Sequence, residues 1–175
     1  MTKVTSLRAC VVMNYIQKLT ISGMVIALYV VILYFTQSFS FGAYQIRIAT
    51  SLYALSYIFP FLVLPLGLAN FIANMLFGGF GIIDMLGGCI VGIVTAFLIT
   101  AIRRLKWNRC LIAIPIIFVP GLGVPVYLCR FLNMPYGVLA VSLCIGQVIP
   151  AITGVLLVRS LERIYGSRSQ RSVDS

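Results

Sequence analysis

The feature that most constrains this chain is a long apolar stretch between Lys18 and Arg103, which carries only two formal charges, Arg47 and Asp84. An ionised side chain at bilayer depth costs about 2.5–3.5 kcal/mol on insertion scales. Arg47 is therefore expected either near a membrane interface or against a protein-lined cavity. Either position brings it close to a molecule that enters from that side.

Length and composition define the class of protein. The chain has 175 residues, of which 61% are hydrophobic and 9% charged, whereas soluble domains average about 25% charged residues. A helix needs about 20 residues to cross a bilayer. We predict an all-α integral membrane protein, a bundle of six transmembrane helices at residues 19–36, 48–64, 66–77, 82–102, 111–128 and 137–158. A basic leader (1–18) precedes this membrane domain (19–162), and a basic disordered tail (163–175) follows it.

The basic residues predict how the chain is oriented. They gather in the leader, in the loop 103–109 and in the tail, and they give a net charge of +10. Because cytoplasmic loops are enriched in Lys and Arg, six spans with both termini in the cytoplasm place all three segments on one side. This pattern indicates orientation rather than nucleic-acid binding. The loops that contain Arg47, Asp84 and Asn133 then fall outside.

The residue inventory argues against several functions. Histidine is absent, and the five cysteines are scattered singly without a C-x-x-C pair. The commonest general base and the commonest transition-metal ligand are therefore missing. We expect no catalytic site, no metal site and no cofactor. An ion channel is disfavoured because the chain has neither a ring of acidic groups nor a filter-like repeat.

A few polar side chains inside the predicted spans are candidates for a substrate site. Carboxamides and a guanidinium offer paired donors and acceptors, and aromatic rings offer faces for stacking. We predict a cavity open to the outside and lined by Tyr53, Asn70, Asn74 and Gln147. The outer loops roof this cavity, and Asn133 in the last of them is a further candidate for substrate binding. Two alternatives stay open: a polar clasp between helices for Asn70 and Asn74, and a capping role in the first turn of a helix for Asp84.

The first predicted span carries a stripe of small residues, Ser22, Gly23 and Ala27. Small residues let two membrane helices approach closely. The partner helix belongs either to this chain or to another subunit.

The fifth predicted span contains Pro115, Pro120 and Pro125, which predict a bent or broken helix.

Three segments carry a family resemblance. The runs FGAYQIRIATSL and GLANFIANMLFGGFGIIDMLGG, followed by CIGQVIP in the last span, resemble the QueT family. The resemblance implies an S-component of an energy-coupling factor (ECF) transporter for queuosine precursors. Its implied partners are a transmembrane coupling subunit, two cytoplasmic ATPases and the lipid bilayer of a bacterial plasma membrane. It also implies that the small-residue stripe docks on the coupling subunit.

The resemblance implies site residues as well. Gln45, Arg47, Asn74 and Asp84 stand at motif positions of the family, whereas Thr50 and Gln147 stand where glutamates are expected. A neutral residue pairs poorly with the ammonium of an aminomethyl-deazaguanine. The expected substrates therefore include a neutral deazaguanine, queuine or another purine-like or vitamin-like molecule, besides the aminomethyl precursor. An autonomous small-molecule facilitator is the alternative outside this class.

Overall fold

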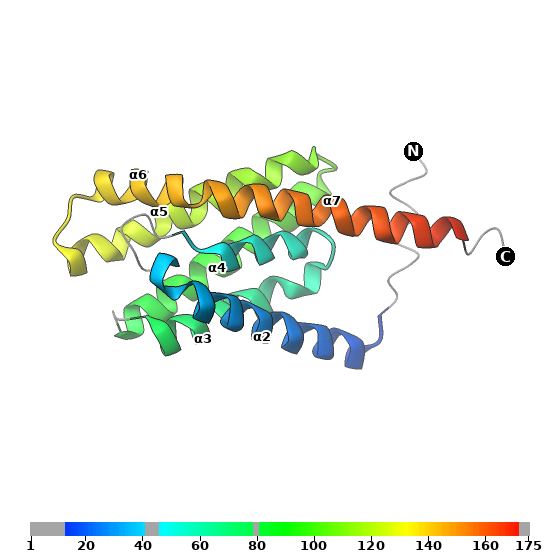
Figure 1. Ribbon diagram of the computed structural model, residues 1–175, viewed down its shortest axis with the longest axis horizontal. Helices are drawn as coiled ribbons and strands as arrows, with labels where there is room; N and C mark the ends of the chain where they lie inside the picture. The colour runs from blue at the N-terminus through cyan, green and yellow to red at the C-terminus, as the bar shows by residue number, and fades with distance from the viewer. Residues whose placement is uncertain (1–12, 41–45, 79–80, 172–175) are drawn as a thin grey trace.

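The computed structural model describes residues 13–40, 46–78 and 81–171, with side chains described for 13–37, 46–78 and 81–164. All regular structure within these ranges is helical (Figure 1). The α-helices are α2 (Tyr15–Ser40), α3 (Val63–Phe77), α4 (Gly81–Arg104), α5 (Ala113–Leu132), α6 (Tyr136–Gly146) and α7 (Val148–Arg171). Three 3-10 helices join them: η1 (Ile48–Tyr57), η2 (Pro60–Leu62) and η3 (Arg109–Ile112).

Within the described residues, five helical segments are long and apolar enough to cross a membrane. They are Tyr15–Gln37, Pro60–Phe77, Ile82–Arg104, Arg109–Leu132 and Tyr136–Ile164. Large apolar side chains such as Phe35, Leu64 and Phe97 face outward from these segments. The prediction of an all-α, multi-pass membrane protein is confirmed.

The second predicted span differs from the expected α-helix. Residues 48–57 form the 3-10 helix η1, and seven of its ten residues are buried. Two hydroxyls bond to the carbonyl three residues earlier, Thr50 to Arg47 and Ser56 to Tyr53, at 2.7 Å each. Such local bonds compete with regular α-helical hydrogen bonding. A 3-10 helix is tighter than an α-helix, so η1 fits between the surrounding helices.

Proline affects the fifth and sixth predicted spans differently. Of the two outcomes expected for the fifth span, a bent or a broken helix, a break is not observed, because α5 runs unbroken with Pro120 and Pro125 inside it. The sixth span instead divides into α6 and α7 at Gln147. Pro150 lacks the N–H that would bond to the carbonyl of Gly146. The two halves still follow one another nearly end to end (Figure 1).

Both terminal helices extend past their predicted limits. Helix α2 begins at Tyr15, inside the predicted leader, and α7 continues to Arg171, beyond the predicted end of the membrane domain. The segment Glu162–Arg171 contains no proline and includes good helix formers such as Arg and Gln, which favours continuation of the helix.

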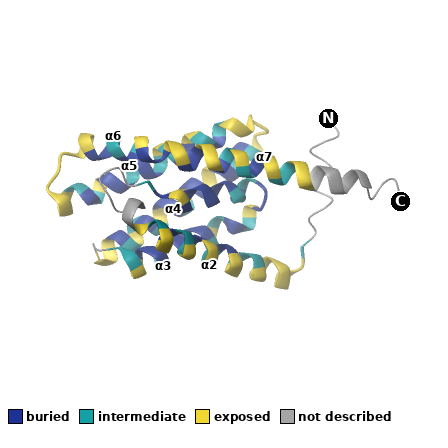
Figure 2. Ribbon diagram, in the orientation of Figure 1, coloured by how far each residue is buried: buried dark blue, intermediate teal, exposed yellow. Residues whose placement is uncertain are grey.

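The bundle has two different ends. The turn after α4 and the C-terminal half of α7 lie at one end, which we call the basic end. The C-terminal end of α3, the start of α4 and the α5–α6 connection lie at the other (Figure 1). Helix α7 projects past the other helices at the basic end. Buried residues concentrate on η1 and on the inward faces of its neighbours (Figure 2). The interior around η1 is therefore the best shielded part of the molecule.

Candidate functional site

Arg47 and Asp84 lie in one buried polar cluster. Their exposed fractions are 6% and 5%, and their charges attract one another. Asn74 stands between them: its Oδ1 accepts a hydrogen bond from Arg47 Nη2, and its Nδ2 donates to the backbone oxygen of Asp84 at 3.0 Å. A longer contact of 3.5 Å joins Nδ2 to Asp84 Oδ1. One carboxamide thus links the two rare charges of the apolar stretch.

Helix α5 adds a tyrosine to this cluster. The hydroxyl of Tyr127 donates to Asp84 Oδ1 at 3.2 Å. Asp84 lies in the first turn of α4, where the helix dipole favours a carboxylate. The same side chain therefore stabilises the start of α4 and takes part in the cluster. The carboxylate therefore joins α4 to α5 as well as to α3.

The cluster also reaches the last two helices through the two positions where the resemblance led us to expect glutamates. The Thr50 hydroxyl lies 2.7 Å from Gln147 Oε1 and 2.7 Å from the backbone oxygen of Arg47. Since a hydroxyl has one proton, it donates to one of these oxygens at a time. Gln147 is only 1% exposed. The two neutral residues, far apart in sequence, form a single contact.

A second polar group lies beside the first. The hydroxyls of Tyr29 and Tyr53 are 3.3 Å apart, and both side chains are fully buried. The amide of Asn70 lies near Tyr53 and donates from Nδ2 to the backbone oxygen of Gly88 at 2.7 Å. Through Tyr29, the inward face of α2 contacts the polar interior.

Three glycines of α4 make room for these side chains. A Cβ at Gly87 would lie 2.5 Å from the Tyr127 ring, one at Gly88 would lie 2.2 Å from Asn74 Nδ2, and one at Gly92 would lie 3.0 Å from the Tyr53 hydroxyl. Any larger residue would push against the polar group opposite. These three glycines of α4 therefore face the polar cluster.

Two predicted site residues lie elsewhere. Asn133 is exposed and follows the last residue of α5 with a left-handed φ of 50°, a conformation that Asn tolerates at helix ends. The structure gives it a capping position and does not bring it into the cluster. Gln45 lies outside the described residues. For both residues, substrate binding stays a prediction.

The small-residue stripe faces away from the bundle. Gly23 and Ala27 are exposed, Ser22 is partly buried, and a Cβ on Gly23 would meet no atom within 4 Å. The opposite face of α2 carries the buried residues Val25, Tyr29 and Leu33. Packing of this stripe within the described part of the chain is thus not observed.

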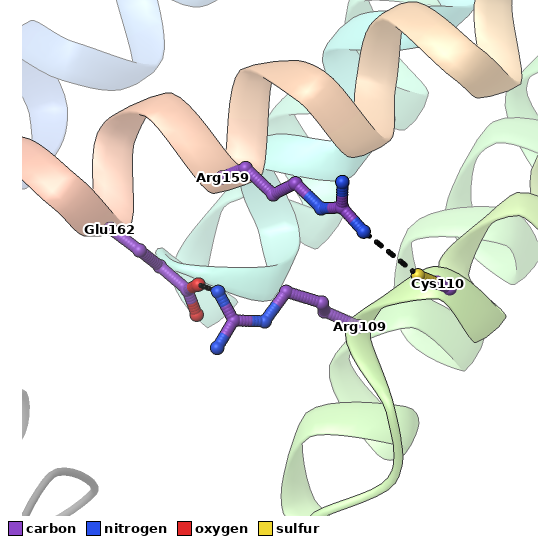
Figure 3. A network of polar contacts seen from close by, with 4 residues as sticks. All are labelled: Arg109, Cys110, Arg159 and Glu162. Carbon is purple, nitrogen blue, oxygen red and sulfur yellow. Dashed lines mark hydrogen bonds and ion pairs between the residues drawn. The ribbon is translucent and has the colours of Figure 1, made fainter.

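A separate polar network lies at the basic end. Arg109 forms an ion pair with Glu162, and Arg159 Nη2 donates to Cys110 Sγ at 3.4 Å (Figure 3). Both contacts join the start of the fifth span to α7. Nearby, Arg103 donates to the backbone oxygens of Tyr57 and Ile58, which closes the end of η1 opposite Arg47.

The sequence analysis missed Tyr29 and Tyr127. Tyrosine in a membrane span is common at interfaces, so neither residue stood out. A signal was available for Tyr127, because Gly87 and Asp84 occupy neighbouring turns of α4 and leave space for a ring beside a carboxylate. For Tyr29, the spacing Val25-x-x-x-Tyr29-x-x-x-Leu33 marks one helical face, but nothing in the sequence identifies the Tyr53 hydroxyl opposite.

Comparison with known proteins gives one match. The model of the family described as QueT transporter covers residues 19–163, which includes every described residue of the polar cluster. Searches of curated proteins and of solved structures gave no match. Because the family model spans most of its length, this multi-pass membrane chain belongs to the QueT transporter family.

Proposed function

We propose that the chain is the substrate-binding S-component of an ECF-type importer in a bacterial plasma membrane. It binds a queuosine-related deazaguanine from the outside for ATP-driven uptake. The observation that carries this proposal is the continuous series of polar contacts from Gln147 through Thr50, Arg47 and Asn74 to Asp84 inside an apolar bundle. Burying polar groups costs free energy unless each group is paired, so binding of a polar substrate gives a reason for their presence here.

The chemistry of the cluster suits a flat, polar base. A deazaguanine has ring N–H and amino donors, a carbonyl acceptor and two π faces. The cluster offers a guanidinium, carboxamides, a carboxylate and tyrosine rings. Each group on the base therefore has a complementary partner type in the bundle.

The contact between Thr50 and Gln147 supports a neutral substrate. An ammonium group binds best beside a carboxylate, and this pair consists of a hydroxyl and an amide. A deazaguanine without a charged substituent, such as the cyano precursor, fits this pair better than the aminomethyl precursor does.

The outward face of α2 supports docking on a coupling subunit that carries two ATPases. Gly23 and Ala27 leave this face thin, which permits close approach of another helix. We expect Gly23→Leu to prevent co-purification with the coupling subunit while substrate binding is kept. Gly137→Leu is the matched control, because Gly137 on α6 also faces open space.

Calorimetry on the purified, detergent-solubilised chain tests the substrate. We expect saturable binding of a deazaguanine, and about a hundredfold loss with Arg47→Ala, since hydrogen bonds to charged groups contribute about 1.5–3 kcal/mol. Arg104→Ala, an exposed arginine at the basic end, is the control and should bind as the wild type does. Absence of binding to any purine or deazapurine would overturn the substrate proposal, and binding of an unrelated vitamin would replace it.

Uptake into liposomes distinguishes the importer from a facilitator. The isolated chain should not move the base across the membrane, because the importer requires its ATPase partners. Uptake by the chain alone would assign it to the facilitators instead.

A further inference from the structure

Two buried oxygens of the site accept no hydrogen bond within the described part of the chain. They are Asp84 Oδ2 and Asn70 Oδ1, on side chains that are 5% and 2% exposed. Most buried acceptors in proteins are satisfied, and one that is not calls for an explanation. Both atoms are acceptors, so any ligand that satisfies them must present donors.

The contacts between α3 and α4 define how these two acceptors are arranged. Asn70 contacts Gly88, and Asn74 contacts Asp84, so the two helices run antiparallel with matching steps of four residues. The two acceptors therefore belong to side chains at successive contacts along one seam, and these contacts are spaced about one helical turn of 5.4 Å along the helix axis. A fused two-ring base can span that separation.

Two glycines add no side chain of their own next to these polar groups. A Cβ on Gly78 would lie 2.6 Å from Asp84 Oδ2, and one on Gly88 would lie 3.4 Å from the Asn70 amide. Even an alanine at Gly78 would crowd the unsatisfied carboxylate oxygen. Gly78 thus leaves room beside that buried oxygen.

We propose that Asp84 and Asn70 read the donor edge of a guanine-type base, an inference that rests on the proposed function. The ring N–H and the exocyclic amino group donate in parallel to the Asp84 carboxylate, which has lone pairs left beyond the Tyr127 contact. Asn70 Oδ1 accepts a further ring N–H. Asp84 thereby selects for the exocyclic amino group, because a base without it leaves one oxygen unsatisfied.

Calorimetry with two ligands tests this assignment on the full chain. Deazaguanine is compared with deazahypoxanthine, which lacks only the amino group. We expect the wild type to bind deazahypoxanthine about 10- to 100-fold more weakly, as for other two-hydrogen-bond readings of a base. Asp84→Asn should bind deazaguanine more weakly and reduce the ratio toward one. Tyr127→Phe, which keeps the carboxylate, should preserve the ratio.

The outcomes separate the two proposals. Equal affinity of the wild type for both ligands, or an unchanged ratio in a folded Asp84→Asn variant, would overturn the reading by Asp84 and leave the proposed function intact. Absence of binding of both ligands would overturn the proposed function itself. The comparison of the two ligands on the wild type tests selection for the amino group even where Asp84→Asn does not fold.

Discussion

The two ends of the bundle use charge in opposite ways. The buried cluster holds one arginine and one carboxylate deep in the protein, where Asn74 contacts both. At the basic end, Arg109 is half exposed and pairs with Glu162, which is 14% exposed. Solvent weakens an exposed pair, whereas a buried charge that loses its partner is strongly destabilising. The number of charged residues in a region therefore does not predict how much those charges contribute to the free energy of unfolding.

Removal of Arg47 should produce the largest difference between the ends. Arg47→Ala leaves Asp84 buried without its cation and removes a donor from Asn74. We expect a loss of about 3–5 kcal/mol in the free energy of unfolding, measured by denaturant unfolding in detergent. The matched variant Arg109→Ala should cost under about 1 kcal/mol. Similar losses for the two variants would contradict the contrast drawn here.

Substitution of Gly88 should have the next largest effect. A Cβ would lie 2.2 Å from Asn74 Nδ2, so Gly88→Ala displaces the carboxamide that joins the charges. Overpacking of this kind costs about 1–3 kcal/mol, and deazaguanine binding should weaken with it. Gly23→Ala, in open space, is the control that separates crowding from the general effect of alanine in a helix. If thermal unfolding and calorimetry show no difference between the two variants, the close approach of α3 and α4 does not constrain the site.

Tyr53→Phe should have a smaller effect. It removes the hydroxyl that lies 3.3 Å from Tyr29 while the ring stays in place. A typical hydrogen bond contributes about 0.5–1.5 kcal/mol net. Tyr29→Phe and the double variant complete a double-mutant cycle in thermal unfolding, in which the coupling energy isolates the pair. Strict additivity of the two single variants would show that this contact does not join α2 to η1.

Sequence reasoning predicted the class of fold and most members of the buried polar cluster because both follow from the cost of placing polar groups in a membrane. Arg47, Asn74 and Asp84 stood out in an apolar background, and the structure brings them together. It did not predict η1, because a 3-10 helix and an α-helix of this composition differ only in local hydroxyl contacts and in the width available between neighbours. Nor did it predict the contact between Thr50 and Gln147, since pairing between distant segments depends on how the helices pack.

The positions of proline in the sequence also did not predict where the helices break. Pro120 and Pro125 lie within the unbroken helix α5, while one proline, Pro150, accompanies the division at Gln147. Each proline removes an N–H donor and leaves a carbonyl without its helical partner, so packing against neighbouring helices decides whether the helix continues. At α5, Gly121 lies so close to α6 that a Cβ there would sit 2.5 Å from Cys144 Sγ. That tight packing supports the helix in a way that composition alone does not reveal.

The smallest expected effect belongs to the ion pair at the basic end. Glu162→Gln keeps the shape of the side chain and removes the charge that faces Arg109 (Figure 3). Because Arg109 is half exposed, solvent and salt screen the attraction. We expect the free energy of unfolding to change by less than about 1 kcal/mol. This change should shrink as the salt concentration rises from about 50 mM toward about 1 M, because the screening length then falls to ~3 Å. Deazaguanine affinity should stay at the wild-type value, since Glu162 lies at the end of the bundle away from Asp84. A loss of affinity with Glu162→Gln would mean that the basic end is energetically coupled to the buried cluster despite their separation along the bundle.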